Sequence, residues 1–314
     1  MKEYRYILEP YKGMKTRHRC PNCEKNGKFT RYIDQHTGEY LGDKTGKCSR
    51  AIKCGYHFPP KQYFSNGGIS IPHINKSLFK KKPQINLQTS YVDRTVLQES
   101  VTNKQANYFL QYLSSIWNDE VVLSLANMYN IGYSSHWNGS TIFWQVDSFG
   151  KIRSGKVMLY DPMTGKRIKK PYSHINWIHK VLKLDKFNLQ QCFFGEHLLN
   201  QNREKPVAIV ESEKTAIIAS IFLPEFVWLA CGSVHNLNNT KTKVLKGRAV
   251  VLFPDLGCYD LWNDKIPKLS KLATYKTSTL LEEKATITER KQGFDLADYL
   301  TSTNILSLFK TNIP

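Results

Sequence analysis

Three short, almost wholly apolar runs in the last third of the chain constrain its fold more than any other feature. They occupy residues 206–210, 226–230 and 248–253, and the first leads directly into a helical pattern at 211–219. Runs this apolar indicate strands covered on both faces, and helices between such strands give βαβ units with parallel strands. The sequence therefore predicts an α/β domain with a parallel sheet over residues 201–314.

Carboxylates follow two of these runs, with Glu211 after the first and Asp255 after the third. Ligands of parallel sheets bind beyond the carboxyl ends of the strands, so both side chains are expected at one edge. Close carboxylates repel each other unless they share a cation, and oxygen ligands suit Mg²⁺ or Mn²⁺, which assist phosphoryl or nucleotidyl transfer. Asp295 and Asp298, after another expected strand near 278–281, are further candidate metal ligands. The alternative for any one of these acids is that it only caps or begins a helix.

Four of the seven cysteines form two pairs near the N-terminus, with two residues inside the first pair and five inside the second. Four thiolates in two pairs are a typical ligand set for tetrahedral zinc. Between the pairs, residues 29–33 predict a strand and residues 36–39 a turn, so that the pairs would face each other. We therefore predict a zinc ribbon over residues 1–62. Its predicted Zn²⁺ ligands are Cys20, Cys23, Cys48 and Cys54.

His57 lies three residues after Cys54 and is the substitute ligand, since a structural zinc site rarely takes five ligands. The alternative is that some of these cysteines are free and buried. A disulfide framework explains them poorly, because seven is an odd number and the first five residues lack the apolar stretch of a signal peptide. No apolar run approaches the roughly 20 residues needed to cross a bilayer, so we expect a cytoplasmic protein without a membrane partner.

The net charge of +19, from 45 basic and 26 acidic residues, favours a polyanionic partner, and nucleic acid is the first candidate. Residues 44–92 hold nine basic residues and no acidic one. Aromatic residues lie among the cations around the cysteines, a composition typical of single-strand binding surfaces. The alternative is a soluble basic protein that binds no nucleic acid. The predicted phosphate-binding residues are Arg50, Lys53, Lys80, Lys81, Lys82, Lys166 and Arg167.

The middle of the chain differs in composition from both ends. Pro, Gly and Lys residues without periodicity predict a basic linker over residues 63–95. Residues 96–200 predict an α+β subdomain. Apolar residues at helical spacing between positions 97 and 129 indicate two amphipathic helices, and residues 141–146 and 156–160 indicate strands of a β-meander.

Short motifs add a family resemblance. Residues 210–216, Val-Glu-Ser-Glu-Lys-Thr-Ala, resemble the first motif of the Toprim domain of primases and topoisomerases. Residues 255–257, Asp-Leu-Gly, are similar to its Asp-x-Asp motif, with Gly257 in place of the second acid. Residues 192–198 are similar to the segment before Toprim in bacterial primases, and the predicted ribbon takes the place of their zinc domain. The chain thus looks like a primase of the type carried by phages and other mobile elements.

The resemblance implies roles for individual residues. It implies that Glu211 acts as a general base or metal ligand, that Asp255 binds metal and that Lys214 contacts phosphate. Gly257 offers no side-chain ligand for a second metal ion. Candidates to replace the missing acid are Asp260, Asp295 and Asp298.

Three functions are compatible with these features. The leading one is a DNA-binding primase of DNA replication, which synthesises short RNA primers on single-stranded DNA by divalent-metal-dependent nucleotidyl transfer. Its partners would be single-stranded DNA, ribonucleotides and a separate replicative helicase, because the sequence contains no Gly-x-x-x-x-Gly-Lys-Ser/Thr motor loop. The alternatives are a non-catalytic single-strand binding protein with a degenerate Toprim scaffold and a Toprim nuclease.

Overall fold

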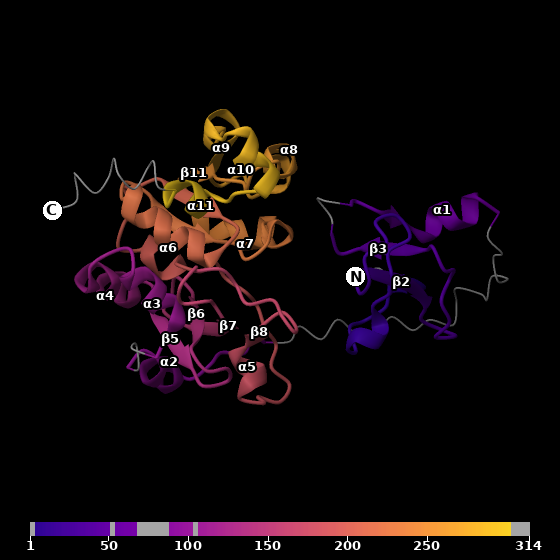
Figure 1. Cartoon of the computed structure of the whole chain (residues 1–314), viewed down its shortest axis with the longest axis horizontal. Coiled ribbons are helices and arrows are strands. Elements are labelled where there is room, and N and C mark those ends of the chain that lie inside the picture. Colours follow the sequence, from indigo (N-terminus) through magenta and orange to yellow (C-terminus); the bar gives the residue numbers. More distant parts are fainter. Residues whose placement is uncertain (1–3, 51–53, 68–87, 103–105, 303–314) are drawn as a thin grey trace. The chain divides into compact units, whose positions relative to one another are not determined.

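The structure is a computed structural model, which describes residues 4–50, 54–67, 88–102 and 106–302. The chain divides into two compact units, Met1–Gln84 and Ile85–Pro314, which we call the N-terminal and C-terminal units (Figure 1). No helix in the described ranges is long and apolar enough to reach across a bilayer. The predicted phosphate-binding residues that lie outside the described residues are Lys53, Lys80, Lys81 and Lys82.

The N-terminal unit is built around a four-stranded antiparallel sheet in the order β1-β2-β3-β4. Its elements are β1 (Tyr6–Leu8), η1 (Met14–Thr16), β2 (Phe29–Asp34), β3 (Gly46–Cys48), β4 (His57–Phe58) and α1 (Pro60–Ser65). β2 confirms the strand predicted over residues 29–33. Gly46 allows β3 to lie against Phe29, because a Cβ there would collide with the Phe29 ring and the Thr30 carbonyl oxygen.

Only a small core holds this unit together. Its fully or nearly fully buried apolar members in the described residues are Cys20, Phe29 and Cys48, with the half-buried Tyr56 packed against them. A core this small supplies little hydrophobic stabilisation, and domains of this kind commonly rely on a metal or on disulfides.

The first half of the C-terminal unit is an antiparallel meander in the order β5-β6-β7-β8, with helices before and after it. Its elements are α2 (Arg94–Ser100), α3 (Tyr108–Ser114), α4 (Asp119–Met128), β5 (Ile131–Ser134), β6 (Ser140–Val146), β7 (Ile152–Met158), β8 (Ile175–Trp177) and α5 (Ile178–Val181). Asn107 ties α3 to the sheet, because its side chain caps the helix and its amide donates to the Gly132 carbonyl oxygen at 2.9 Å. α3 and α4 confirm the two predicted helices.

The second half is a four-stranded parallel sheet in the order β10-β9-β11-β12. Its strands are β9 (Val207–Val210), β10 (Val227–Ala230), β11 (Ala249–Leu252) and β12 (Thr274–Thr277). Every residue of β9 and β10 is buried, as their apolar composition predicts. The prediction of an α/β fold with a parallel sheet is confirmed.

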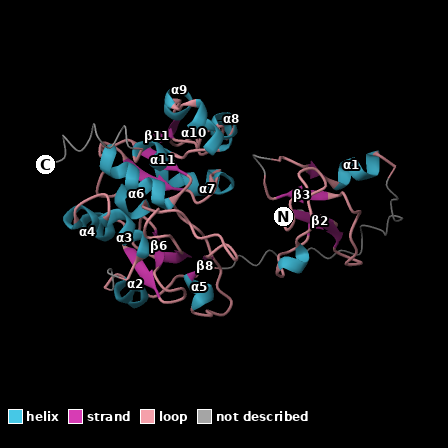
Figure 2. Ribbon diagram, viewed as in Figure 1, coloured by secondary structure: helices cyan, strands magenta, loops and turns pink. Residues whose placement is uncertain are grey.

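Short helices connect and cover these strands (Figure 2). They are η3 (Glu196–Leu199), α6 (Glu213–Phe222), η4 (Val234–Asn236), α7 (Asn239–Thr242), η5 (Lys243–Leu245), α8 (Tyr259–Asn263), η6 (Ile266–Lys268), α9 (Leu280–Lys284), α10 (Ile287–Gln292) and α11 (Leu296–Leu300). α6 packs on β9 and β10, and α11 packs on α6 (Figure 1). One apolar core joins both halves of the unit, since the rings of Phe143 in β6 and Phe194 meet edge to face at 5.6 Å, and Phe194 pairs its backbone with Ala230 of β10.

Two predicted strands were wrong in position. The strand expected at 156–160 is β7, which begins at Ile152, because Asp147 closes a tight turn directly after β6 by accepting the backbone N–H groups of Phe149 and Lys151. The strand expected near 278–281 is β12, which ends at Thr277 and is followed by α9. β12 alternates exposed and half-buried residues, as an edge strand does, so it lacks the apolar run that marks β9 to β11.

Candidate metal sites

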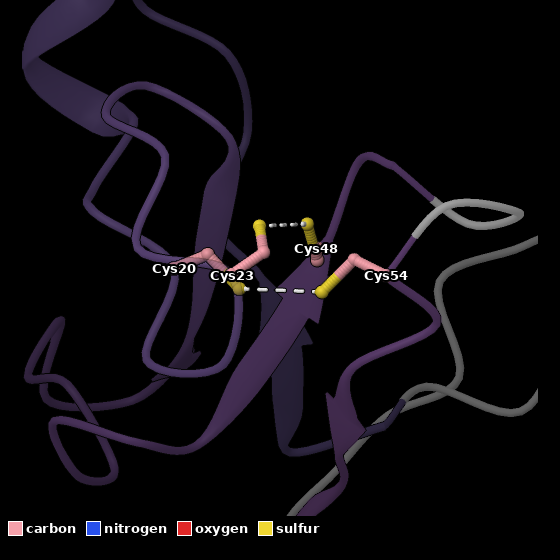
Figure 3. Close-up of side chains that lie close together, drawn as sticks. All are labelled: Cys20, Cys23, Cys48 and Cys54. Atoms are coloured by element: carbon pink, nitrogen blue, oxygen red, sulfur yellow. Dashed lines mark hydrogen bonds between the residues drawn. The ribbon is translucent and has the colours of Figure 1, made fainter.

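The four cysteines of the N-terminal unit converge (Figure 3). Their sulfur atoms all lie within 4.8 Å of one another, with Cys20 Sγ 3.7 Å from Cys54 Sγ and Cys23 Sγ 4.0 Å from Cys48 Sγ. Tetrahedral zinc with Zn–S bonds of about 2.3 Å places its sulfurs about 3.8 Å apart. The donor set and its spacing therefore fit one Zn²⁺.

Tight turns position these thiols. The Cys20 carbonyl oxygen accepts the N–H of Glu24, and the Arg50 carbonyl oxygen accepts the N–H groups of Cys54 and Gly55, whose φ of 65° favours glycine. Polar donors also face the sulfurs. The Arg50 N–H lies 3.4 Å from Cys48 Sγ, and the Asn22 amide lies 3.5 Å from Cys54 Sγ. Such donors stabilise thiolate charge.

The thiols differ in acidity before any metal binds. The backbone N–H of Lys25 lowers the pKa of Cys23 to about 6, and the Asn22 amide lowers the pKa of Cys54. Burial instead raises the pKa of Cys48. Cysteine must be deprotonated to bind zinc, so the lowered pKa of Cys23 and of Cys54 favours metal capture.

His57, the substitute ligand, lies outside the converging group. It belongs to β4, and its Nε2 is 2.9 Å from the Tyr32 hydroxyl group, with which it shares a hydrogen bond. The two rings also stack at a centroid distance of 6.1 Å. The geometry therefore favours the four thiols as the ligand set, with His57 engaged on the neighbouring strand.

A second group of predicted residues lies at the carboxyl edge of the parallel sheet. Glu211 directly follows β9, and Asp255 follows β11 after two residues. Asp295 caps α11, where its side chain and that of Asp298 form a reciprocal capping box. Burial, together with the carboxylates of Asp295, Glu211 and Asp298, raises the pKa of Asp255 to about 8. The three other acids therefore lie close enough to act on Asp255.

These carboxylates do not converge as the thiols do. In the part of the chain that the structure describes, the cysteines are the only group of three or more His, Cys, Asp or Glu whose ligand atoms all lie within 4.8 Å. Mg²⁺ in proteins is usually held by one or two carboxylates, with waters and substrate phosphates in the other positions. We call this edge, with Glu211, Asp255, Asp295 and Asp298, the acidic edge. It fits that kind of site better than one in which every metal ligand comes from the protein.

Gly257 stands at the position where the Toprim motif has its second acid. Gly257 has a φ of 76° and is exposed, and its N–H donates to Glu282 Oε1 at 2.8 Å. Asp260 is exposed on α8. Asp295 and Asp298 are the two candidates whose charges act on Asp255.

Cations border the acidic edge. Lys214 Nζ lies 3.6 Å from Asp298 Oδ1 and donates to the Gly165 carbonyl oxygen at 3.3 Å. Arg167 partly opposes the rise in the pKa of Asp255, so its guanidinium also acts on this edge. Lys166, its neighbour in the loop after β7, is exposed. Of the predicted phosphate-binding residues that the structure describes, Lys214 and Arg167 are therefore the two that border the acids.

A buried ion pair at this edge was missed by sequence reasoning. Lys156 on β7 donates to both carboxylate oxygens of Glu213, at 3.0 and 3.1 Å, and only 14% and 3% of the two side chains are exposed. The available signal was a lysine inside the otherwise apolar end of a strand. The pair joins the antiparallel sheet to the start of α6.

Family comparisons cover the two units separately. Residues 4–69 match the zinc beta-ribbon finger family, which together with the four converging thiols supports a Zn²⁺ site. Residues 107–256 match a family described as a domain of unknown function, DUF6371. No curated protein matches the chain.

Solved primase structures are similar to the chain at low scores. The RNA polymerase domain of the primase DnaG from Mycobacterium tuberculosis has a TM-score of 0.44 and 9% identity, covering 69% of this chain and 79% of that one. The primase fragment of the bacteriophage T7 primase-helicase protein has a TM-score of 0.38 and 10% identity, covering 88% and 98%. A DnaG primase catalytic domain bound to ssDNA has a TM-score of 0.37 and 11% identity, covering 66% and 80%. Likeness at this level carries no argument about activity, which rests on the residues themselves.

Proposed function

We propose that the protein is a primase-like nucleotidyltransferase, which joins ribonucleotides into short primers on single-stranded DNA. The observation that carries this proposal is the acidic edge, where Asp255 is held among the carboxylates of Glu211, Asp295 and Asp298. Holding like charges together costs free energy unless a cation binds there. The sheet position of these acids also supports a Toprim-type domain over residues 201–314, as the motifs at 210–216 and 255–257 imply.

In the proposed reaction the residues have distinct tasks. Glu211 and Asp255 would hold Mg²⁺ or Mn²⁺, which when bound lowers the pKa of an attacking hydroxyl group and offsets charge on the phosphoryl group. Glu211 would accept the hydroxyl proton. Lys214 and Arg167 bind phosphate oxygens of the nucleotide, because they are the cations that border the acids. The hydroxyl oxygen bonds to the α-phosphorus as pyrophosphate leaves.

The N-terminal unit would hold the template. A ribbon over residues 1–62, a basic linker over 63–95 and a primase-like subdomain over 96–200 are the proposed division of the remaining chain. Arg50 lies beside the thiol cluster, and the linker carries the run from Lys80 to Lys82. Cations that contact phosphates position a strand without reading its sequence. The same proposal includes a separate replicative helicase as a partner and a phage or another mobile element as the source of the protein.

The test is a priming assay with labelled ribonucleotides, single-stranded DNA and Mg²⁺ or Mn²⁺. The wild-type protein should make short RNA products, and Asp255→Asn should abolish them because it removes a metal-binding charge while keeping the side-chain shape. Asp260→Asn is the matched control, since this exposed acid lies five residues away on α8. No product from the wild-type protein, or equal product from Asp255→Asn, would contradict the proposal.

One observation favours a non-catalytic single-strand binding protein as the second candidate. Gly257 stands where the motif has its second acid, so the edge offers fewer ligands than the Toprim pattern implies. That protein would bind single-stranded DNA but make no primers, with or without the Asp255 carboxylate. The nuclease alternative gives a third result in the same assay, which is metal-dependent shortening of the DNA strand.

A further inference from the structure

We propose that a basic groove on the C-terminal unit, centred on Phe149, holds a single strand of nucleic acid as it runs to or from the acidic edge. Only the course of the strand, to or from the acidic edge, rests on the proposed function. We call it the Phe149 groove.

Two adjoining pockets make up the Phe149 groove. Their volumes are about 1020 Å³ and about 490 Å³, and both are lined by Ser148, Phe149 and Val244. Because these three residues are shared, the two pockets lie next to each other at the turn between β6 and β7. Together they offer more room than either pocket alone.

The charge of the groove is strongly one-sided. The larger pocket is lined by Arg153, Lys241, Lys243 and Lys268, and the smaller one by Arg203, Lys246 and Arg248. The only carboxylate among the lining residues of the two pockets is Glu196. Its oxygens accept the backbone N–H groups of Ser148 and Phe193, so it is already engaged within the protein. Arg153 is paired with Asp147, and Lys241 and Arg248 donate to backbone carbonyl oxygens. The exposed cations that suit a polyanion are therefore Lys243 and Lys268 in the larger pocket and Arg203 and Lys246 in the smaller one.

Phe149 provides an aromatic surface at the junction. Its side chain is 85% exposed at the tip of the turn between β6 and β7. Single exposed apolar residues are common, but this one stands on a turn that is fixed from two sides. Asp147 Oδ1 accepts the N–H groups of Phe149 and Lys151 at 2.9 and 3.0 Å, and Asn200 donates to the Ser148 carbonyl oxygen.

The same contacts explain the motif at residues 192–198. Glu196 is buried, and its Oε1 lies 3.2 Å from the Ser148 nitrogen atom, so the motif anchors the turn that presents Phe149. A ring held in solvent beside cations is the arrangement on which unpaired bases stack in single-strand binding proteins.

The two pockets lie near opposite ends of the parallel strands. In the larger pocket, Lys241 donates to the carbonyl oxygen of Cys231, which directly follows β10 at the same edge as Glu211. The smaller pocket is lined by Gly247 and Arg248, which precede β11 at the opposite edge. Four-residue strands are about 13 Å long, which is about four nucleotides at the stacked spacing of about 3.4 Å. A length of about four nucleotides fits a single strand of nucleic acid better than a mononucleotide.

The first experiment measures binding of the full-length protein to fluorescent oligo-dT and oligo-U over a range of salt concentrations, without nucleotides. The variant Lys243→Gln, Lys246→Gln, Lys268→Gln removes three exposed cations of the groove. It should weaken binding and reduce the salt slope by about 2, because each phosphate contact contributes about 0.7 for single strands. The control Lys276→Gln, Lys284→Gln, Lys291→Gln removes the same charge from exposed positions outside the groove. Equal slopes for the two variants would overturn the inference, and the two oligonucleotides distinguish DNA from RNA as the strand.

The second experiment tests the aromatic contact. Phe149→Ala should weaken binding between about fivefold and about a hundredfold, the range for one stacked base, and Phe149→Trp should restore it. The thermal midpoint should not change, because the ring is exposed. Cross-linking with a 5-iodouracil oligonucleotide should attach the strand at Phe149. Binding that is the same in Phe149→Ala and the wild-type protein, without a cross-link there, would overturn the groove. These measurements need no primer synthesis, so they remain valid if the priming assay fails. If both groove variants prime normally, the groove is refuted and the proposed function is not.

Discussion

The cysteine cluster and the acidic edge are both predicted metal sites, yet the chain builds them in opposite ways. The cysteines come from the end of β3 and from turns beside the same small sheet, and their sulfurs already lie within 4.8 Å of one another. The acids come from β9, β11 and α11, and they reach one edge of the sheet without converging. Local turns hold the thiols together, whereas the acids are carried by elements far apart in the sequence. A structural site can therefore be formed by the fold alone, while a site for catalysis is left to be completed by cation and substrate.

Removal of zinc should have the largest effect, because it tests whether the cysteine cluster holds its unit together. Structural zinc contributes about 10–16 kcal/mol of apparent binding free energy, far more than the small core around Phe29 can replace. Cys20→Ser with Cys23→Ser should lose the single zinc ion measured by elemental analysis and make the N-terminal unit sensitive to protease. His57→Asn should keep the zinc, since His57 lies outside the cluster. Full zinc content in the double variant would contradict the assignment.

The next effect tests whether the acidic edge is stabilised by its own cations. Lys156→Met should destabilise the C-terminal unit by about 3–5 kcal/mol in urea unfolding, because it leaves the Glu213 carboxylate buried without a partner. Adding Glu213→Gln should recover much of that loss. Lys214→Met is the comparison variant, and it should cost less because 39% of the side chain of its partner Asp298 is exposed, so that carboxylate keeps its contact with water when the lysine is removed. Equal losses from the two lysine variants would show that burial of the pair is not what matters.

The contrast between these lysine–carboxylate ion pairs and the cysteines also shows which features the sequence can predict. The strands β9 to β11 and the thiol pairs are encoded by neighbouring residues, so apolar runs and short spacings reveal them. Lys156 and Glu213 are 57 positions apart on elements whose packing no local pattern describes. β12 was misplaced for the same reason, since an edge strand is defined by its neighbour rather than by its composition.

The exposed turn at Phe149 is another feature that needed the fold. In the sequence, Asp147 and Glu196 are unrelated acids. In the structure, both accept backbone N–H groups of one turn, at Phe149 and Ser148 respectively, and thereby fix the position of an exposed ring. Composition predicted an affinity for nucleic acid, but only the packing of the β6–β7 turn against residues 192–198 indicates where a strand would lie.

The smallest effect expected is the stabilisation of the acidic edge by metal, which depends on pH. Without metal, the pKa of Asp255 is about 8, against about 3.9 for an unfolded aspartate, so the folded protein keeps a proton that the unfolded chain releases. Stability should therefore fall as pH rises from about 4 to 8, and Asp255→Asn should remove this slope. Mn²⁺ must displace the same proton, so its stabilising effect should grow between pH 6 and pH 8. At ten times its Kd it should reach about 1.4 kcal/mol. Differential scanning fluorimetry with and without Mn²⁺ measures both trends, with Asp260→Asn as the control that should behave like the wild-type protein. A metal response that is independent of pH, or unchanged in Asp255→Asn, would place the cation elsewhere and leave the acidic edge as a group of helix caps, because Asp295 and Asp298 already serve α11 in that way.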